Sequence, residues 1–340
     1  MDNNVTEKLL ELQGVKTYFY TDDGVTKAVD GVDLHINSGE ILGLVGESGC
    51  GKSVTSLTTM QLIGPPGKTI EGEIFFRGTD LCKLTEEELT DIRGNDMAMI
   101  FQEPGSALNP VQKIGAQISE VIRRHLGLDK QEAWKRSVEL LEQVKIPDAD
   151  QRAHSYPHEL SGGMAQRVMI AMALACDPVL LIADEPTTAL DVTIQAQILS
   201  LVSELRERTD TAVLLITHDL GIVADSCDRV AVMYAGNIVE QASTDDIFHD
   251  SKHPYTQGLL ESIPVIGERT DRLDVIPGVV PSLIDLPPGC KFAPRCQQRK
   301  DHDMSICTEV DPELQIVEDS NEHLVRCWLY HDYDGHEAPY

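Results

Sequence analysis

The chain has 340 residues, so more than one domain is expected, because single hydrophobic cores stop growing at about 250–300 residues. Its formal net charge is -28, with 56 Asp and Glu against 28 Lys and Arg, which argues against nucleic acid or an anionic membrane surface as a general partner. The acids are spread along the chain, which favours adaptation to high salt, a halophilic source, over a single acidic patch.

No stretch approaches the roughly 18–20 consecutive apolar residues of a membrane span, and the first residues lack the basic and apolar regions of a signal peptide. We therefore expect a chain that is made and kept in the cytosol. Eight cysteines in that compartment are not expected to form a disulfide framework. Four of them are scattered, and the other four gather near the C-terminus.

Residues 5–45 alternate or cluster apolar side chains between turn signals, which predicts an antiparallel layer of short strands: Leu9–Leu12, Lys16–Tyr20, Thr26–Val29 and Val32–Ile36. Three aromatic residues, Tyr18, Phe19 and Tyr20, lie in this layer. One of them could stack on a nucleotide base, or all three could pack within the strands; the pattern alone leaves both open.

An apolar run, Ile41–Val45, precedes Gly46-Glu47-Ser48-Gly49-Cys50-Gly51-Lys52-Ser53, and a helix is expected to begin near Lys52. This is the strand-to-helix context of a phosphate-binding P-loop. Glycines let backbone N–H groups turn toward phosphate oxygens, the lysine adds a positive charge, and the serine hydroxyl can bind Mg²⁺. The sequence therefore predicts a nucleoside triphosphate site at this loop.

The next segment predicts a helix from Leu57, a strand at Gly72–Gly78, and an acidic helix that starts at Thr85 with a capping-box sequence. An apolar strand, Met97–Gln102, ends in a glutamine and is followed by a Pro- and Gly-containing loop. Apolar residues then recur at spacings of three and four over residues 111–145, which predicts an all-helical insertion.

A second glycine-rich turn, Leu160-Ser161-Gly162-Gly163, opens an Ala- and Met-rich helix whose N-terminus would suit an anion. Two continuous apolar runs follow, Val179–Ala183 before Asp184-Glu185 and Ala212–Ile216 before Thr217-His218. Such runs are typical of parallel strands that are covered on both faces, with functional residues at their ends.

These motifs occur in the order and spacing of an ATP-binding cassette, and the chain resembles a transporter ATPase subunit over about residues 9–265. The resemblance implies an α/β P-loop NTPase of ABC type, with a parallel-sheet core, an antiparallel β layer, an inserted helical subdomain and a small Cys-rich C-terminal extension. The bounds it suggests are 1–102 and 166–250 for the nucleotide-binding core, 103–165 for the helical subdomain, 251–330 for the extension and 331–340 for a disordered tail.

The resemblance also implies residue roles. Catalysis would fall to Glu185, which polarises the attacking water, and to His218, Gln102 and Lys52, while Ser53, Gln102 and Asp184 would hold Mg²⁺. Phe19, more than Tyr18, aligns with the residue that stacks on adenine. The residues expected to contact ATP are Phe19, Gly46, Ser48, Gly49, Cys50, Gly51, Lys52, Ser53 and Val54, with Ser161, Gly162, Gly163 and Asp191 acting at a dimer interface.

In this family the Ser161–Gly163 turn caps the ATP of a second cassette, so we expect a dimer, with a paralogous ATPase subunit favoured over a second copy. Met164 replaces the glutamine of the general signature, as it does in peptide-importer cassettes. The other expected partners are two transmembrane permeases and an extracellular substrate-binding protein, which would place the chain at the cytoplasmic face of the membrane. The alternative is a soluble cassette ATPase acting on nucleic acid or ribosomes, which the acidity and the single cassette disfavour.

The segment from Lys252 to Leu260, followed by Ile276-Pro277-Gly278, resembles the extension of cassettes that serve peptide and nickel importers. Peptides are the favoured substrate, with nickel and oligosaccharides as alternatives. The extension holds Cys290, Cys296, Cys307 and Cys327, which could bind a metal centre. Family members with a [4Fe–4S] cluster at matching cysteines favour that cluster, while zinc and free or disulfide-linked thiols stay open.

Overall fold

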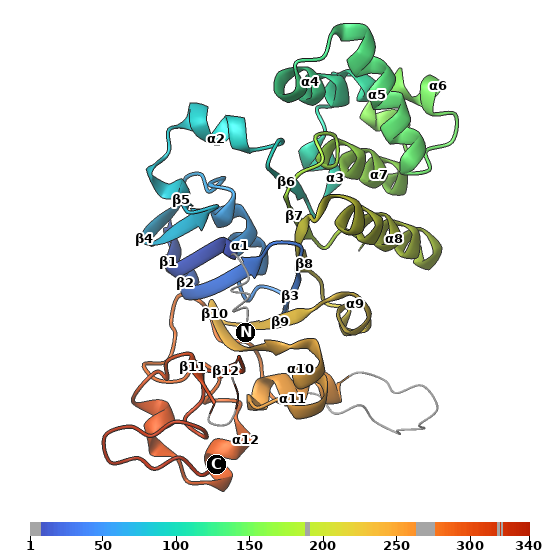
Figure 1. Cartoon of the computed structure of the whole chain (residues 1–340). Coiled ribbons are helices and arrows are strands. Elements are labelled where there is room, and N and C mark those ends of the chain that lie inside the picture. Colours follow the sequence, from blue (N-terminus) through green and yellow to red (C-terminus); the bar gives the residue numbers. More distant parts are fainter. Residues whose placement is uncertain (1–7, 188–190, 263–275, 318–319, 321) are drawn as a thin grey trace, which may run out of the picture. The chain divides into compact units, whose positions relative to one another are not determined.

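The computed structural model describes residues 8–187, 191–262, 276–317, 320 and 322–340, and these divide into two compact units (Figure 1). The first unit consists mainly of Phe76–Ile216, with Ile36–Glu40. The second unit contains Leu10–His35, Ile41–Phe75 and Thr217–Tyr340. The domain bounds expected from the sequence differ from the bounds of these two units, and they stay predictions.

The first unit contains a buried parallel sheet, as the apolar runs predicted. Strand β6 (Met97–Ile100) pairs with β7 (Leu180–Asp184), and β7 pairs with β8 (Ala212–Ile216), both in parallel. Every residue of the three strands is buried, which explains their continuous apolar sequence. The other elements of the unit are β5 (Thr79–Asp80), α2 (Glu86–Ile92), α3 (Pro104–Ala107), α4 (Ile114–Leu126), α5 (Lys130–Gln143), α6 (Ala149–Ala153), α7 (Gly162–Ala173) and α8 (Val192–Thr209).

Two local predictions in this unit are confirmed. The N-terminus of α2 carries a capping box, in which Thr85 Oγ1 accepts a hydrogen bond from Glu88 N at 3.4 Å and Glu88 Oε2 accepts one from Thr85 N at 2.8 Å. Residues 111–145 form helices α4 and α5, which pack against each other through their buried apolar faces and through a Ser119–Ser137 hydroxyl hydrogen bond of 2.8 Å.

The second unit holds two further groups of strands. One sheet has the order β2 (Gly24–Asn37), β1 (Lys8–Thr21), β4 (Gly67–Phe76). In the other, β3 (Ile41–Val45) pairs in parallel with β9 (Arg229–Tyr234), and β9, β10 (Asn237–Ser243), β12 (Leu324–Val325) and β11 (Gln315–Ile316) continue as antiparallel neighbours. The helices of this unit are α1 (Lys52–Thr59), α9 (Leu220–Ser226), α10 (Thr244–Asp250), α11 (Pro254–Glu261) and α12 (Gln297–Asp301).

The expectation of four short strands before the P-loop is wrong. The chain forms two long strands of 14 residues each, β1 and β2, which continue through Gly14 and Gly31. The backbone N–H of Gly14 donates to Asp33 Oδ1 at 2.8 Å, so the two strands stay tied together at the point where the sequence suggested a break. A glycine inside a strand can mark an irregularity of the strand instead of its end.

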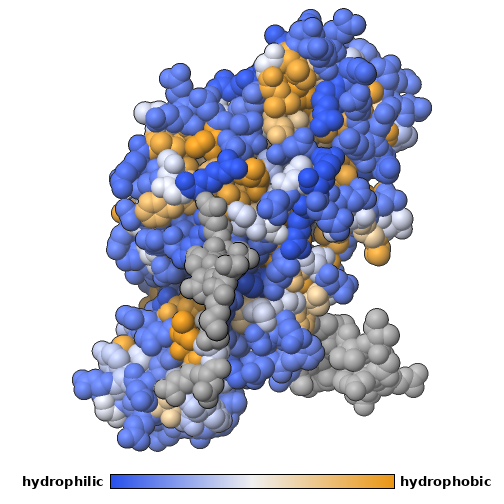
Figure 2. Space-filling view, viewed as in Figure 1, coloured by the Kyte–Doolittle hydropathy of each residue, from blue (hydrophilic) through white to orange (hydrophobic). Residues whose placement is uncertain are grey.

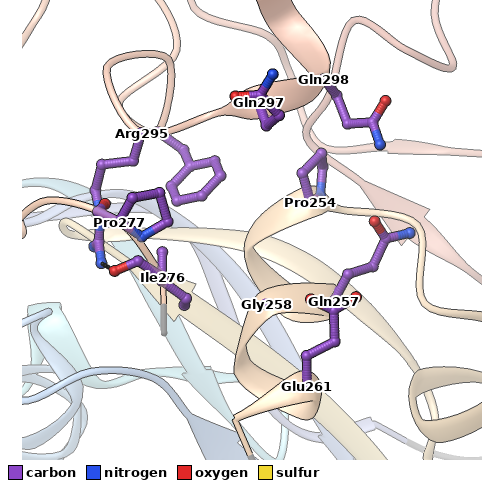
Figure 3. A pocket seen from close by; sticks show the side chains of 10 residues that line it. Pro254, Gln257, Gly258, Glu261, Ile276, Pro277, Arg295, Gln297 and Gln298 are labelled. Atoms are coloured by element: carbon purple, nitrogen blue, oxygen red, sulfur yellow. Dashed lines mark hydrogen bonds between the residues drawn. The ribbon is translucent and has the colours of Figure 1, made fainter. Parts of the chain in front are cut away.

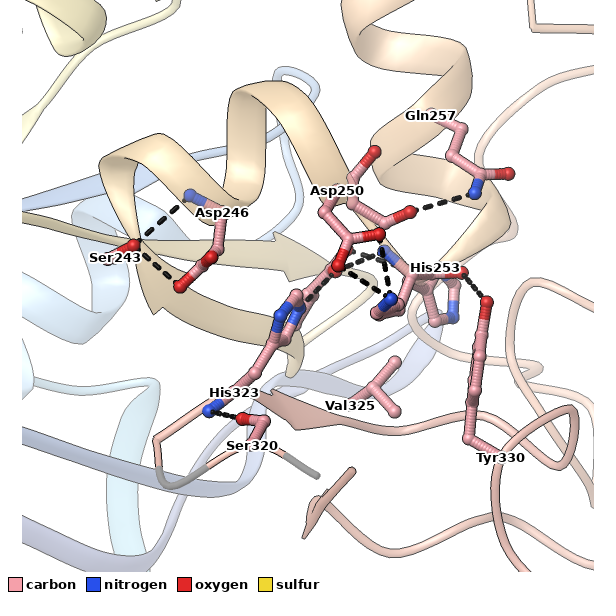
Figure 4. Close-up of polar contacts among 12 residues, drawn as sticks. Ser243, Asp246, Asp250, His253, Gln257, Ser320, His323, Val325 and Tyr330 are labelled. Atoms are coloured by element: carbon pink, nitrogen blue, oxygen red, sulfur yellow. Dashed lines mark hydrogen bonds and ion pairs between the residues drawn. The ribbon is translucent and has the colours of Figure 1, made fainter. Parts of the chain in front are cut away.

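The C-terminal extension is joined to β10 by a fully buried carboxylate. Glu240 on β10 is 0% exposed, and it accepts hydrogen bonds from the backbone N–H groups of Lys252 and His253, the latter at 3.0 Å. His323 Nε2 lies 2.7 Å from the same carboxylate, and Figure 4 shows the His323 ring within this group of polar contacts. A buried carboxylate is tolerated when hydrogen bonds replace those to water. Through these contacts, Glu240 holds both the first residues of the extension and His323 against β10.

Residues 331–340 do not form the disordered tail that we expected. The buried His331 ring lies 2.9 Å from the carbonyl oxygen of Val325, and the backbone N–H of Tyr340 donates to Leu329 O at 3.1 Å. The rings of Tyr333 and Trp328 are in contact, with centroids 5.1 Å apart. These polar-looking residues pack because their aromatic rings cover the small core around Trp328.

The face seen in Figure 2 is mostly hydrophilic, in keeping with the excess of acidic residues. Among the residues that the structure describes, no helix is long and apolar enough to cross a membrane.

Candidate functional site

The P-loop connects β3 to α1 in the second unit, as predicted. Gly46 and Gly51 have φ angles of 152° and 115°. A Cβ atom at these positions would lie 2.1 Å from Met233 O and 2.2 Å from Ala28 O, so only glycine fits. The loop can therefore turn tightly over β9 and β2 and direct its backbone N–H groups to one place.

Lys52 opens α1 and is buried, with 6% of its surface exposed. Its ammonium group donates to the carbonyl oxygens of Gly46 at 2.7 Å and Glu47 at 3.1 Å, which fixes the positive charge inside the loop. The Cys50 thiol lies 3.9 Å from this ammonium group, and burial raises its pKa, so it stays neutral. A cation at a helix N-terminus surrounded by backbone amides is a suitable site for phosphate.

The other predicted residues of the second unit are more accessible. Ser48 and Gly49 are exposed at the tip of the loop, Ser53 and Val54 are half-buried in the first turn of α1, and His218 is exposed just after β8. Phe19 is half-buried, and its ring packs against the backbone of Gly67. Tyr18 donates its hydroxyl hydrogen bond to Asp30, so this ring is already engaged within the strands. Base stacking by Phe19 stays a prediction.

In the first unit, the structure brings together Gln102 and Glu185. Gln102 Nε2, just after β6, donates to Glu185 Oε2 at 3.2 Å. Asp184 is the last residue of β7 and is 3% exposed. Glu185 has a φ of 47°, a left-handed conformation that is costly for a residue with a side chain and that is often found at functional sites.

The Ser161–Gly163 turn forms the start of α7. Ser161 Oγ accepts a hydrogen bond from Met164 N at 3.4 Å and so caps the helix, while Ser161 and Gly162 are exposed. Asp191 likewise caps α8 by accepting from Ile194 N at 3.0 Å. The neighbouring Ala189 and Leu190, which the sequence assigned to the same interface loop, lie outside the described residues.

Sequence reasoning missed a link between this turn and the strand end that bears Glu185. Gln166, on α7, is 1% exposed and donates from Nε2 to the carbonyl oxygen of Pro186 at 2.9 Å. The only signal was a glutamine in an otherwise Ala- and Met-rich helix. This hydrogen bond fixes the Pro186 turn against the helix that follows the glycine-rich turn.

The four C-terminal cysteines lie close together in the second unit. Cys290, Cys307 and Cys327 belong to or pack against one small core with Trp328, and Cys296 is near enough to all three for their charges to interact. Burial raises the pKa of all four thiols, to about 12 for Cys290 and about 11 for Cys307. Within the described part of the chain, however, no three His, Cys, Asp or Glu side chains adopt an arrangement that could hold a metal ion.

A second contact that the sequence did not indicate involves the P-loop itself. Arg295, from the loop between Cys290 and Cys296, forms an ion pair with Glu47 at 2.7 Å. Burial alone would lower the pKa of this guanidinium, but hydrogen bonds to Glu47 and Tyr234 outweigh burial and raise it. The group is therefore permanently charged.

Comparison with known proteins matches two families. The ABC transporter family matches residues 29–188, and the oligopeptide/dipeptide transporter C-terminal region matches residues 239–302. The chain is 52% identical to the oligopeptide transport ATP-binding protein AppD of Bacillus subtilis, over 95% of this chain and 97% of that protein. It is 50% identical to the probable peptide ABC transporter ATP-binding protein y4tR of Sinorhizobium fredii, over 96% of both chains.

A solved structure with a similar fold is the dimeric, post-hydrolysis ATP-binding cassette MJ0796 bound to ADP and Pi. It has a TM-score of 0.63 and 29% sequence identity, and the match covers 69% of this chain and 98% of that one. The predicted ABC-type α/β fold is therefore confirmed.

Proposed function

Because the chain belongs to the family of ABC transporter ATP-binding proteins, we propose that it is the ATP-hydrolysing subunit of an importer for oligopeptides or dipeptides. The observation that carries this proposal is the extent of the match. About half of the residues are identical to those of peptide-transport relatives over 95% of the chain, including the C-terminal region that is typical of oligopeptide and dipeptide transporters.

The proposed nucleotide chemistry is divided among the motifs. Lys52 and the backbone N–H groups of Gly49–Ser53 bind the β- and γ-phosphates. Ser53, Gln102 and Asp184 offer the oxygen ligands that Mg²⁺ prefers, and the ion neutralises phosphate charge when it is bound.

Glu185 accepts a hydrogen bond from the attacking water, and His218 contacts the γ-phosphate. The Gln102–Glu185 hydrogen bond supports this assignment, because it fixes the carboxylate beside a proposed Mg²⁺ ligand.

The proposal extends to the assembly. Ser161–Gly163 close over ATP bound to a second cassette, which is a paralogue, and the pair opens and closes two transmembrane permeases at the cytoplasmic face of the membrane. An extracellular binding protein supplies the substrate. The exposed position of Ser161 and Gly162 at the start of α7 supports a contact with another chain.

The test uses the chain assembled with its permeases, partner cassette and binding protein in liposomes. ATP hydrolysis is measured with the binding protein loaded with a mixture of di- to hexapeptides, with Ni²⁺, or with oligosaccharides. We expect peptides to stimulate hydrolysis and Lys52→Ala to abolish it. Stimulation by Ni²⁺ or by oligosaccharides, and not by peptides, would refute peptides as the substrate. Hydrolysis that persists in Lys52→Ala would refute the assigned nucleotide site.

We also propose that Cys290, Cys296, Cys307 and Cys327 bind a [4Fe–4S] cluster. Three of these thiols lie in or against one small core and Cys296 lies near all three, which supports the proposal because such a cluster takes four cysteine ligands. The absence of a metal-ligand arrangement among the described residues means that the thiols would have to rearrange on binding.

The test is to purify the chain anaerobically and to measure iron, acid-labile sulfide and zinc. Equal iron and sulfide that are lost in Cys327→Ser, but retained in the exposed Cys82→Ser control, would support the cluster. Zinc alone, or no metal, would exclude it.

A further inference from the structure

The P-loop and the C-terminal extension are joined by a bidentate ion pair within the second unit. Arg295 Nη1 donates to Glu47 Oε2 at 2.7 Å, and Arg295 Nη2 donates to Glu47 Oε1 at 3.1 Å. The two residues are 248 positions apart in the sequence. The Arg295 side chain is 5% exposed and that of Glu47 is 29% exposed, so the pair is largely shielded from water. Bidentate pairs of this kind fix both distance and orientation.

Arg295 is itself fixed by the extension. Its Nε donates to the carbonyl oxygen of Pro277 at 2.9 Å, and Nη1 lies 3.4 Å from the Tyr234 hydroxyl. The guanidinium also lies 5.9 Å from the centre of the Phe292 ring. Figure 3 shows Arg295 beside Pro277 and Ile276, on one side of a cavity of about 190 Å³ that α11 closes on the other. These contacts restrict the movement of the Arg295 side chain, so the ion pair fixes the position of the Glu47 carboxylate.

A second contact fixes the backbone at the same residue. The N–H of Glu47 donates to the Tyr255 hydroxyl at 2.8 Å, and Tyr255, on α11, is 0% exposed. The carbonyl of Glu47 accepts from the Lys52 ammonium group at 3.1 Å. Glu47 therefore contacts two separate segments of the extension and also the lysine that holds the positive charge of the loop.

The negative charge of Glu47 is unfavourable in a loop that binds phosphate, and the ion pair with Arg295 neutralises it. A loop that receives a triphosphate carries a carboxylate on its second residue, and an unpaired carboxylate there would repel phosphate and compete with it for Lys52. Pairing with a buried guanidinium neutralises this charge and directs the carboxylate toward the extension.

We propose that the extension is part of the nucleotide-binding apparatus and that Arg295 is a positioning residue, which neutralises Glu47 and fixes the first turn of the P-loop for a nucleoside triphosphate. This inference rests on the proposed function of the loop. It assigns to the extension a direct effect on ATP affinity, which an extension that only contacts other proteins would not have.

The test measures the dissociation constant of a fluorescent ATP analogue with Mg²⁺ on the full chain. Arg295→Ala is expected to weaken binding by about tenfold, because it leaves the Glu47 carboxylate unpaired. The matched control is Arg326→Ala. Arg326 is another well-buried arginine of the extension, with 14% of its side chain exposed, and its side chain pairs with Asp311 and donates to Ile238 O and Pro312 O. Its variant is expected to bind like wild type.

The decisive step repeats Arg295→Ala in a Glu47→Gln background. If Arg295 acts through the Glu47 charge, the second substitution causes little or no further loss. An equal tenfold loss in both backgrounds, or the same loss in Arg326→Ala, would overturn the proposal, because the arginine would then serve only the fold of the extension. If Arg295→Ala does not melt cooperatively, Arg295→Lys, which keeps the charge but not the bidentate geometry, takes its place in the same comparison.

Lys52→Ala separates this inference from the proposed function. Failure of the wild-type chain to bind the analogue, or binding that Lys52→Ala leaves intact, would refute nucleotide binding by the loop. Binding that depends on Lys52 but not on Arg295 would refute the positioning role alone.

Discussion

Gln102 donates a hydrogen bond of 3.2 Å from Nε2 to Oε2 of Glu185, and so links the second residue after β6 to the first residue after β7. The two strands are parallel neighbours in one sheet, with Ile100 opposite Ala183, so both side chains emerge at the same edge. Polar residues at the carboxyl ends of adjacent parallel strands are where α/β proteins place their chemistry. The amide of Gln102 therefore orients one oxygen of the Glu185 carboxylate.

Glu185→Gln is therefore expected to lower the turnover of ATP by about 100-fold or more, since a neutral amide cannot act as the base. ATP binding is expected to stay within about threefold of wild type, because the loop that we propose to hold the phosphates is unchanged. The measurements are phosphate release by the assembled importer and binding of a fluorescent ATP analogue.

The matched control for this prediction is Glu204→Gln, which removes an exposed carboxylate on α8 that interacts with Ser200. It should leave turnover unchanged. Equal turnover in Glu185→Gln and Glu204→Gln would remove Glu185 from the mechanism.

Much of the local structure could be predicted because the signals for it are short-range. The Thr85–Glu88 capping box needs residues three positions apart, and the buried strands β7 and β8 contain four and five consecutive apolar residues. The order of the motifs then identified the family, and with it the fold.

The contacts that sequence reasoning missed join distant parts of the chain. Nothing local marks Arg295 as the partner of Glu47, since each residue alone is typical of a polar loop. The aromatic packing of Tyr333 on Trp328 likewise belongs to a small core that includes Val325 of β12, the strand that pairs with β10. The composition of residues 331–340 indicated a disordered tail because most of them are polar and the aromatic residues among them form no regular pattern.

Ser161→Ala tests the glycine-rich turn. Ser161 caps α7, so its loss is expected to cost about 1 kcal/mol of stability, and turnover should also fall by at least about tenfold if the hydroxyl contacts ATP on a partner cassette. The matched control is Ser243→Ala, because Ser243 caps α10 in the same way, accepting from Asp246 N at 3.1 Å.

The two serine variants should show similar losses in a thermal melt, but only Ser161→Ala should lose ATP hydrolysis in the assembled importer. Similar turnover in both variants would reduce the role of Ser161 to that of a helix cap.

The net charge of -28 predicts that salt stabilises the fold. Raising KCl shortens the screening length from about 10 Å at 0.1 M to about 3 Å at 1 M, which weakens repulsion among the acidic side chains. The melting temperature of the chain should therefore rise over this range. The experiment uses KCl because sulfate salts also strengthen apolar burial in any protein, which would raise the melting temperature without charge screening. A melting temperature that is constant or falls would argue against adaptation to high salt.

His253 should make the stability of the chain depend on pH. Its side chain is 1% exposed, and burial lowers its pKa from 6.5 to about 4, against the opposing charge of Glu240. Between pH 6.5 and pH 4, His253 therefore binds a proton in the unfolded chain but stays neutral in the folded chain. Stability due to the neutral ring is complete above pH 6.5 and is lost as the pH falls toward 4, by about 3 kcal/mol in total.

His253→Asn isolates this effect from other groups that titrate in the same range. His253 caps α11 by accepting a hydrogen bond at Nδ1 from Tyr255 N at 3.0 Å, and an asparagine oxygen can replace that acceptor without titrating. Urea unfolding at pH 7.5 and pH 5 should show a loss in wild type that exceeds the loss in His253→Asn by about 2 kcal/mol. The control His249→Asn changes a histidine whose side chain is 76% exposed and should retain the wild-type difference. Equal losses in wild type and His253→Asn would mean that the buried ring accepts its proton in the folded chain.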